Sequence, residues 1–451
     1  MRLDCFKAYD IRGRLGRDLT PEIAARIARA LAGHLGARRV VIGRDPRPSS
    51  PDLAQAAVAA LVRAGVQVID LGLCGTEEVY FATDHTGADA GICITASHNP
   101  ITDNGMKLVG RGAAPLAGLA PIRALAEAGE GVPDAPGGSC TAAPDLRGAY
   151  VARVLSFVDA QCLPPLKVVV NCGNGAAGPA LAALGDALAG AGSPLMLLPM
   201  FDTPDPTFPN GIPNPLLPEN QPVTGQAVIA QGADFGVALD GDFDRCFLFD
   251  HLGRFVPGEQ VVALLAQAML ARHPGATIIH DPRALYATTT AVAAAGGRAV
   301  AAPTGHAYLK AAMRRENAVY GGELSAHHYF RDFMFCDSGM IPWLLVAALI
   351  GHSGRSLADL VQASRSAFPS SGEINFRHSD PAAARDRIIA HFAAEKPARD
   401  DLDGLSLDFG HWRLNLRNSN TEALLRLNVE SRGDADLVAK KAAMIAALLT
   451  G

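Results

Sequence analysis

The sequence lacks the paired cysteines of a zinc site or a disulfide framework. Its eight cysteines include no Cys-x-x-Cys pair, and the two nearest, Cys162 and Cys172, are ten residues apart. A long apolar stretch is also missing, because the longest run, residues 341–350, has ten residues where a membrane helix needs about 18 or more. Residues 1–13 already carry five charged side chains, unlike a secretory signal. We therefore expect a protein of the reducing cytoplasm.

Charge is scarce as well. Only 19% of the 451 residues are charged, and 40 basic against 45 acidic side chains give a net charge of −5. This balance excludes a broad basic surface for nucleic acid or for an anionic membrane, although local positive pockets stay open. Apolar residues are abundant, at 49%. At roughly 150 residues per domain, this length predicts a well-buried chain of about three domains.

One local pattern occurs three times. A short β-branched run ends in a polar or glycine turn, an alanine-rich stretch of helical period follows, and a second apolar run comes after it. Strand, helix and strand with such short connections are typical of a parallel βαβ unit, so we expect three related α/β domains. The runs and helices are 40–45 with 51–64, 168–173 with 176–188, and 277–282 with 287–295.

The domain limits are placed by composition. Residues 129–144 are rich in Gly, Pro and Ala and are interpreted as a linker before a helix over 146–157, and a second junction is expected near 253–258. After 368–372 the pattern changes to alternating strands and a terminal helix from Ala435, which indicates a small α+β domain. The predicted domains are residues 1–145, 146–253, 254–367 and 368–451.

Three carboxylates alternate between two apolar runs. Asp240, Asp242 and Asp244 would project to one side of an extended segment, where their charges repel unless a cation joins them. This pattern predicts a hard divalent metal, and an acidic hairpin turn is the alternative. A calcium loop of the EF-hand type is excluded, because Arg245 and His251 stand where Gly and Glu are required.

A serine and a histidine follow another buried run, residues 92–96. Ser97 and His98 first suggest a serine hydrolase, but adjacent side chains are expected to diverge and no Gly-x-Ser-x-Gly sequence occurs. An ordinary loop serine is the default for this segment alone.

Gly173, Gly175 and Gly178 fit the dinucleotide fingerprint Gly-x-Gly-x-x-Gly between a strand and a helix, so a dinucleotide-dependent oxidoreductase is the alternative from another class.

Two further loops combine groups suited to sugar phosphates. Residues 321–328 bring Glu323, Ser325, His327 and His328 into one short segment, which can bind hydroxyl groups and supply a general base; core histidines are the alternative. Residues 417–421 with Arg426 combine guanidinium, hydroxyl and amide donors, as a phosphate clamp requires; a solvated turn is the alternative.

Together these segments resemble the α-D-phosphohexomutase superfamily and, within it, bacterial phosphomannomutases. The resemblance covers nearly the whole chain and includes residues 6–13, 208–215, 325–331 and 426–430. It implies three similar mixed α/β domains and a C-terminal α+β domain around a central cleft. It also implies a phosphorylated Ser97 and one Mg²⁺ per chain held by Ser97 with Asp240, Asp242 and Asp244. Departures are Ala326 and Phe243, where many relatives have Gly, Ala423, where Pro is common, and Arg283, where Lys is frequent.

The resemblance also implies residue roles. A phosphoryl group passes from Ser97 to a hydroxyl of the sugar phosphate, the hexose 1,6-bisphosphate turns around, and its other phosphoryl group returns to Ser97. The implied catalytic residues are Ser97, His98, Arg12, Lys107, Arg245 and His327, with His327 as the general base. The implied substrate contacts are Tyr9, Arg283, Gly305, His306, Glu323, Ser325, Arg417, Ser419, Asn420, Thr421 and Arg426.

The expected function is interconversion of mannose 6-phosphate and mannose 1-phosphate, supplying GDP-mannose for polysaccharide synthesis. Hexose 1,6-bisphosphate is the expected activator. The sugars mannose and glucose differ only at C2, so action on glucose phosphates is expected too. The expected partners are small hexose phosphates, without nucleic acid or membrane, and the expected state is a monomer or weak dimer. A protein that acts mainly on glucose phosphates, and a non-catalytic sugar-phosphate sensor, remain as alternatives.

Overall fold

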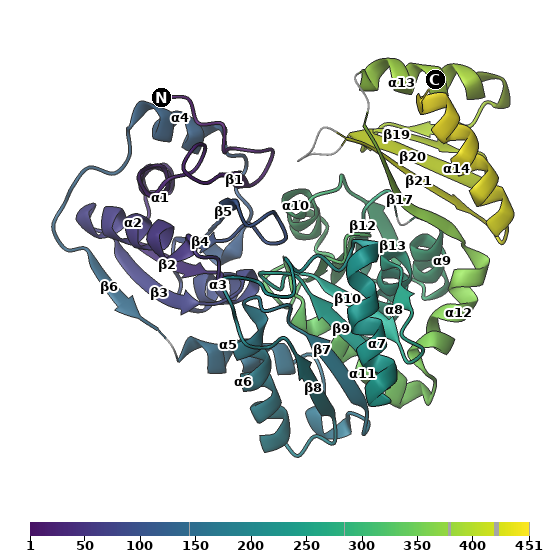
Figure 1. Cartoon of the computed structure of the whole chain (residues 1–451), viewed down its shortest axis with the longest axis horizontal. Helices are drawn as coiled ribbons and strands as arrows, with labels where there is room; N and C mark the ends of the chain where they lie inside the picture. The colour runs from purple at the N-terminus through teal and green to yellow at the C-terminus, as the bar shows by residue number, and fades with distance from the viewer. Residues whose placement is uncertain (144, 284, 378–379, 419–423, 451) are drawn as a thin grey trace. The chain divides into compact units, whose positions relative to one another are not determined.

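The computed structural model describes residues 1–143, 145–283, 285–377, 380–418 and 424–450 (Figure 1). The chain divides into two compact units, which are described separately. Unit 1 comprises residues 1–255 and 327–357, and unit 2 comprises residues 256–326 and 358–451.

The first sheet of unit 1 has six strands in the order β1-β5-β4-β2-β3-β6. Strands β2, β3, β4 and β6 are parallel, and β5 runs antiparallel to β4 and β1. The strands are β1 (Ile11–Arg14), β2 (Arg39–Arg44), β3 (Gln67–Leu73), β4 (Ala90–Ile94), β5 (Asp103–Gly110) and β6 (Ser139–Ala142). The helices are α1 (Pro21–Leu35), α2 (Ser50–Arg63), α3 (Thr76–His85) and α4 (Ala120–Ala128).

Both faces of this sheet are buried, which explains its continuous apolar strands. In β2, Val40 and Ile42 pack into a cluster with α1, α2 and α4, whereas Val41 packs with Val79 of α3 on the opposite face. Alternate side chains of a strand point to opposite faces, so a strand covered by helices on both sides needs apolar residues throughout. The sequence prediction of a βαβ unit here is confirmed.

The predicted linker over residues 129–144 is partly wrong, because β6 lies within it. Ser139–Ala142 pairs in parallel with β3, and all four residues are exposed. A short edge strand of small residues has no buried face and therefore no alternation of apolar and polar positions to reveal it.

The second sheet of unit 1 contains the order β10-β9-β7-β8. Strands β7, β8 and β9 are parallel and β10 is antiparallel to β9. The strands are β7 (Lys167–Asn171), β8 (Met196–Met200), β9 (Phe235–Leu239) and β10 (Cys246–Asp250), with α5 (Leu146–Leu155), α6 (Ala177–Gly190) and α7 (Gln221–Gln231). Unit 1 also holds the antiparallel pair β15 (His328–Phe330) and β16 (Cys336–Asp337), and the buried helix α11 (Met340–Ser353).

Unit 2 contains the third βαβ arrangement. Its strands β12 (Thr277–His280), β13 (Arg298–Ala301) and β14 (Tyr320–Gly322) are parallel in the order β13-β12-β14. The accompanying helices are α8 (Gly258–Arg272), α9 (Tyr286–Ala294) and α10 (His306–Glu316). In the chain, β11 (Phe255–Val256) and α12 (Leu357–Ala367) lie at the boundaries between the two units.

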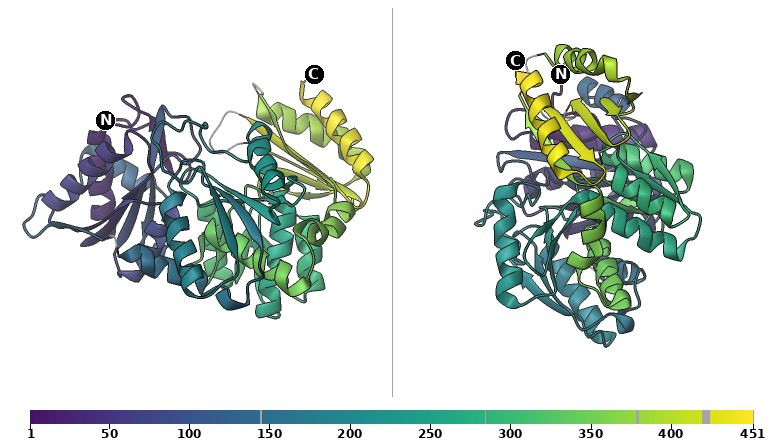
Figure 2. Two further views of the ribbon diagram at one scale, coloured as in Figure 1. Left: turned by 60° about the horizontal axis from the view of Figure 1, so that its bottom comes forward. Right: turned by 90° about the vertical axis from the view of Figure 1, so that its right-hand side faces the viewer.

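The second half of unit 2 is an antiparallel sheet in the order β17-β21-β20-β19-β18, drawn in green and yellow (Figure 2). Leu414 and Leu427 lie on the face covered by α13 and α14, whereas Arg417 and Arg426 lie on the opposite face. This polar face carries part of the candidate site. The elements are β17 (Ser370–Phe376), β18 (Ala398–Asp400), β19 (Leu405–Asp408), β20 (Trp412–Asn418), β21 (Leu425–Ser431), α13 (Pro381–Phe392) and α14 (Ala435–Thr450).

Three mixed α/β sheets and one antiparallel α+β sheet confirm the predicted fold class. The domain limits after residues 145, 253 and 367 stay a prediction. All eight cysteines are free. Among the described residues no single helix is long and apolar enough to cross a membrane, and only the bent pair of α11 and α12 meets both criteria together.

The glycines of the dinucleotide-like sequence have a packing role. A Cβ on Gly178 would lie 1.5 Å from the carbonyl oxygen of Asp202, and one on Gly175 would lie 2.7 Å from that of Gly241. Both distances are far inside van der Waals contact, so these positions require glycine whether or not a nucleotide binds. The fingerprint thus has a structural explanation.

We predict opposite effects for two glycine substitutions in α6. Gly178→Ala should lower the free energy of unfolding by about 3 kcal/mol or more, because the backbone must move to admit the methyl group. Gly185→Ala, where the new Cβ meets only Leu197 at 3.7 Å, should raise it by about 0.5–1 kcal/mol through helix propensity. Urea unfolding of both variants tests this, and equal midpoints would contradict it.

Candidate active site

The three aspartates lie together in the loop between β9 and β10. One oxygen from each of Asp240, Asp242 and Asp244 falls within a 4.8 Å cluster, and all three residues are buried. The expectation that they share one side is confirmed, but the segment is not extended: it turns at residues 241–242, and Phe243 has a φ of 45°. This left-handed conformation is one that glycine adopts more readily than phenylalanine.

The carboxylates are incompletely satisfied. Within the described part of the chain, the Oδ1 atoms of Asp240, Asp242 and Asp244 are buried without a hydrogen-bond partner. Burial, together with repulsion from Asp244 and Asp242, raises the pKa of Asp240 to about 7. Buried oxygens of this kind without partners fit a hard divalent cation such as Mg²⁺, which prefers carboxylate ligands.

Close backbone contacts hold this loop on several sides. A Cβ on Gly241 would lie 2.6 Å from the carbonyl oxygen of Ser97, and the amide of Ala176 donates to the carbonyl of Gly241 at 2.9 Å. The first residue of α3, Thr76, donates through Oγ1 to Asp242 at 2.6 Å and through its amide to the Asp242 carbonyl at 3.1 Å. The loop is therefore fixed by three segments that are distant in sequence.

Ser97 lies directly against this carboxylate cluster. Its Oγ donates to Asp240 Oδ2 at 2.7 Å and lies 2.9 Å from His98 Nδ1. The expectation that the side chains of Ser97 and His98 diverge is wrong, because Ser97 adopts a left-handed conformation with a φ of 52°. A hydrolase triad still does not form, since the serine donates to the carboxylate itself and not through the imidazole.

Lys107 binds two of the aspartates directly. Its ammonium group donates to Asp242 at 2.7 Å and also to Asp244. Burial alone lowers the pKa of a lysine, but the charges of Asp242 and Asp244 outweigh burial and raise the pKa of Lys107 well above its ordinary value. The same ammonium group holds the pKa of buried Asp242 down to about 2.

Two arginines complete the positive surroundings of Ser97. Arg12 of β1 donates to Asn99 Oδ1 at 2.6 Å and to the carbonyl of Ala96 at 3.3 Å, and Arg245 Nε lies 3.5 Å from Asp240. Burial, followed by the charges of Arg245 and Arg12, lowers the pKa of His98 well below its usual value. Tyr9, two residues before β1, is half-buried.

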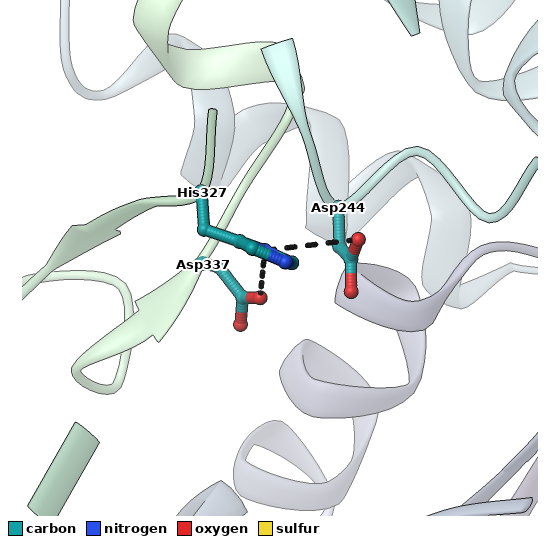
Figure 3. Close-up of side chains that lie close together, drawn as sticks. All are labelled: Asp244, His327 and Asp337. Atoms are coloured by element: carbon teal, nitrogen blue, oxygen red, sulfur yellow. Dashed lines mark ion pairs between the residues drawn. The ribbon is translucent and has the colours of Figure 1, made fainter. Parts of the chain in front are cut away.

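His327 lies beside the same cluster (Figure 3). Its Nδ1 is 2.9 Å from Asp337 Oδ2 and 3.8 Å from Asp244 Oδ1. Burial lowers the pKa of a histidine, but the carboxylates of Asp244 and Asp337 outweigh it and raise the pKa of His327. The preceding Ala326 has a φ of 68°, a left-handed conformation that glycine adopts more readily than alanine.

Some residues of this site were missed by the sequence analysis. Buried Arg47 donates to the carbonyl groups of the Ser97 loop, among them Ser97 at 2.8 Å and Asn99 at 2.6 Å, and thereby fixes the loop. Asp337 was missed because it follows His327 by ten residues in no recognisable spacing. A carboxylate directly after the apolar residues 333–336 is the signal that could have indicated it.

Unit 2 contains a second charged cluster. Arg283, Arg417 and Arg426 all form ion pairs with Glu373, at 2.8, 3.2 and 3.0 Å. Arg283 is also bound by Asp281 at 2.7 Å. The predicted clamp residues Arg417 and Arg426 are thus brought together, and Glu373 is a residue that the sequence analysis missed.

Glu323 lies in the same unit and is buried after β14. Its Oε1 accepts a hydrogen bond from the amide of Gly305 at 2.9 Å, which joins two of the predicted sugar-binding segments. His306 is the first residue of α10, and Ser325 is half-buried. The remaining predicted clamp residues, Ser419, Asn420 and Thr421, lie outside the described residues, as does Ala423.

Comparison with protein families gives four matches in chain order. Models of the phosphoglucomutase/phosphomannomutase family match as alpha/beta/alpha domain I over residues 4–128, domain II over 148–253, domain III over 257–368 and the C-terminal domain over 373–448.

Individual relatives span the full chain. A phosphomannomutase of Salmonella montevideo is 55% identical over 452 residues, covering 99% of both chains. Phosphohexose mutases of Xanthomonas campestris are similar at 54% identity over 457 residues, covering 100% of both chains. The crystal structure of a phosphoglucomutase/phosphomannomutase family protein from Burkholderia thailandensis has a TM-score of 0.86 at 30% identity, covering 98% of this chain and 96% of that one.

We predict that Mg²⁺ stabilises the protein through the aspartate cluster. At about 100 times its Kd the ion should stabilise the folded state by about 2.7 kcal/mol, measured as a rise in Tm that a chelator reverses. Asp244→Asn should lose most of this rise, because one of the carboxylate ligands is neutralised.

The matched control is Asp250→Asn, at the end of β10. Asp250 is a buried aspartate of the same hairpin, but it pairs with Arg254 at 2.7 Å. This variant should lower Tm yet keep the full response to Mg²⁺. An equal loss of response in both variants would show that the aspartate cluster is not the site.

Proposed function

We propose that the protein interconverts mannose 6-phosphate and mannose 1-phosphate through a phosphorylated Ser97. The proposal starts from the family: the chain belongs to the phosphoglucomutase/phosphomannomutase family and is an isomerase of the phosphomutase class. One observation carries the proposal. The buried hydroxyl of Ser97 lies 2.7 Å from Asp240, in a cluster of three carboxylates whose Oδ1 atoms have no hydrogen-bond partner in the described part of the chain. Phosphoryl transfer needs a nucleophile beside such a cation site.

The proposed reaction has two transfers. In the first, the bond between phosphorus and Ser97 Oγ breaks, and a bond forms between phosphorus and a hydroxyl oxygen of the hexose phosphate. In its neutral form His327 takes the hydroxyl proton at Nε2, because its Nδ1 faces Asp337 and keeps the ring's own proton. In the second transfer, after the intermediate has reoriented, the bond between the other phosphorus and its sugar oxygen breaks and a bond forms between that phosphorus and Ser97 Oγ. The freed sugar oxygen takes back the proton from His327.

The chain's own residues prepare this transfer. Arg47 fixes the Ser97 loop through its carbonyl groups, and Arg12 and Lys107 provide positive charge near a phosphoryl group carrying about −1.5 to −2. Ser97, Asp240, Asp242 and Asp244 would hold one Mg²⁺, which supplies charge neutralisation for the serine oxygen as leaving group.

The clamp residues of unit 2 are proposed to bind the phosphate that does not react. Arg417 and Arg426 offer guanidinium groups suited to a phosphate, with Ser419, Asn420 and Thr421 as further donors. Glu323 and Ser325 are proposed to bind sugar hydroxyls, with Gly305, His306, Arg283 and Tyr9 as further contacts. We further propose hexose 1,6-bisphosphate as activator and GDP-mannose synthesis as the use of the product. The oligomeric state and the cellular compartment stay predictions.

Replacing Ser97 tests the nucleophile. Ser97→Ala should lower kcat by at least about a thousandfold with mannose 1-phosphate, Mg²⁺ and hexose 1,6-bisphosphate present, because no oxygen remains to carry the phosphoryl group. Mass spectrometry should find a phosphoryl group on Ser97 of the native protein only. Ser156→Ala, an exposed serine whose Oγ donates to Arg153, is the control. Near-normal turnover by Ser97→Ala would refute the assignment.

A second prediction concerns sugar choice. Glucose 1-phosphate should be converted with a kcat/KM within about 100-fold of that for mannose 1-phosphate, since a site that binds the hydroxyls common to both sugars discriminates weakly. Measuring both substrates on one sample with and without chelator tests this, and both activities should fall together when the metal is removed. A much larger preference for either sugar would contradict the proposed shared contacts.

A further inference from the structure

Glu373 is the common partner of three arginines. Its Oε2 lies 2.8 Å from Arg283 Nη1 and 3.2 Å from Arg417 Nη2, and its Oε1 lies 3.0 Å from Arg426 Nη1. The Arg283 and Arg417 side chains are only 1% and 3% exposed. One carboxylate therefore serves as the shared counter-charge of three crowded guanidinium groups.

The strands themselves create the need for this counter-charge. Arg417 of β20 and Arg426 of β21 are directly opposite partners in the antiparallel register. Like charges at such positions repel, because opposite side chains are about 5 Å apart. Glu373 comes from β17 on the other side of β21 and is located on the same polar face. Burial raises the pKa of a glutamate, but the charges of Arg283, Arg426 and Arg417 hold that of Glu373 below its usual value, so it is ionised.

Glu373 leaves part of the cluster available to a ligand. Arg283 donates through Nε and Nη2 to Asp281, so its donors are engaged by the protein. Arg417, in contrast, has a buried Nε without a hydrogen-bond partner in the described ranges; Asp403 Oδ2 lies 3.9 Å from it. Burial and the charge of Arg283 lower the pKa of Arg417. A buried guanidinium with an unused donor favours a further anion.

We propose that Glu373 is a positioning residue, which holds Arg417 and Arg426 at the spacing and orientation that a phosphate monoester requires and ties them to Arg283. The inference rests on the proposed function, in which that phosphate belongs to the hexose phosphate. The inference also extends the proposed function, because Glu373 touches no reacting atom and acts only through the arginines. Without its charge, the opposed guanidinium groups are expected to separate.

The test uses Glu373→Gln, which keeps the shape and removes the charge. The first measurement is the rise in Tm caused by inorganic phosphate, which needs no catalysis; this rise should fall to less than half of that of the native protein. The second is kinetics with mannose 1-phosphate, where KM should rise by about tenfold and kcat should change by less than about threefold, since binding and not chemistry is affected. Glu373→Asp keeps the charge and should recover part of both.

Two further variants show whether the changes in phosphate response and KM arise at this arginine cluster. Glu430→Gln removes another buried carboxylate of the same sheet, paired with Arg413 at 2.8 Å, and should lower Tm while keeping the phosphate response and KM. Arg417→Gln should lose the phosphate response, which locates the response at this cluster.

Several results would overturn the proposal. An unchanged or larger phosphate response in Glu373→Gln would mean that Glu373 competes with the phosphate or only stabilises the fold, and an absent response in the native protein would remove the basis of the inference. If Glu373→Gln does not fold, Glu373→Asp decides: its side chain is one methylene shorter and should hold the three arginines less well, so a KM and a phosphate response equal to those of the native protein would refute the role. Absence of mutase activity would instead refute the proposed function, while the phosphate response still tests Glu373.

Discussion

Buried carboxylates in need of positive charge are the constraint on which unit 1 depends. Asp240, Asp242 and Asp244 leave the solvent together, and their mutual repulsion is strong in a low dielectric. Lys107 binds both Asp242 and Asp244, the hydroxyl of Thr76 donates to Asp242, and close backbone contacts hold the loop. The three Oδ1 atoms, which have no hydrogen-bond partner among the described residues, then present a place for one more cation beside the serine hydroxyl.

The cluster in unit 2 has the opposite sign and the same physical logic. Three guanidinium groups are crowded together, and one carboxylate, Glu373, is shared among them. The buried donor left on Arg417 favours an anion, as the oxygens left on the aspartates favour a cation. In the proposed reaction, the aspartate cluster serves the phosphoryl group that is transferred and the arginine cluster binds the phosphate that does not react. The net charge of −5 conceals both, because charges of opposite sign cancel in the sum over the chain.

The sequence predicted those features whose cause is local. Three strand and helix repeats follow from runs such as residues 40–42 and the alanine-rich helices after them, and the structure places these elements within one or two residues of the prediction. The aspartates could be predicted to act together because they occupy one loop. The strand β6 could not, since its exposed residues carry no periodic signal.

Other features depend on contacts between distant segments. Ser97 meets Asp240 across 143 residues, Lys107 meets Asp242 across 135, and Arg283 meets Glu373 across 90. No periodicity of a single segment encodes such pairs, because they form only when separate elements pack. The divergence expected of Ser97 and His98 was wrong for a related reason: Ser97 has a left-handed backbone, imposed where its loop packs against Gly241 and Arg47.

By itself, then, the sequence determined the α/β repeats, the antiparallel C-terminal part and the residue types that can bind a metal and a phosphate, since these follow from periodicity and side-chain chemistry. Only the tertiary structure decided which charges neutralise one another. Arg47, Asp337 and Glu373 take their roles from it, because the role of a buried charge depends on the oxygen or nitrogen atoms within about 4 Å of it. Those atoms come from strands and loops that the chain brings together only on folding.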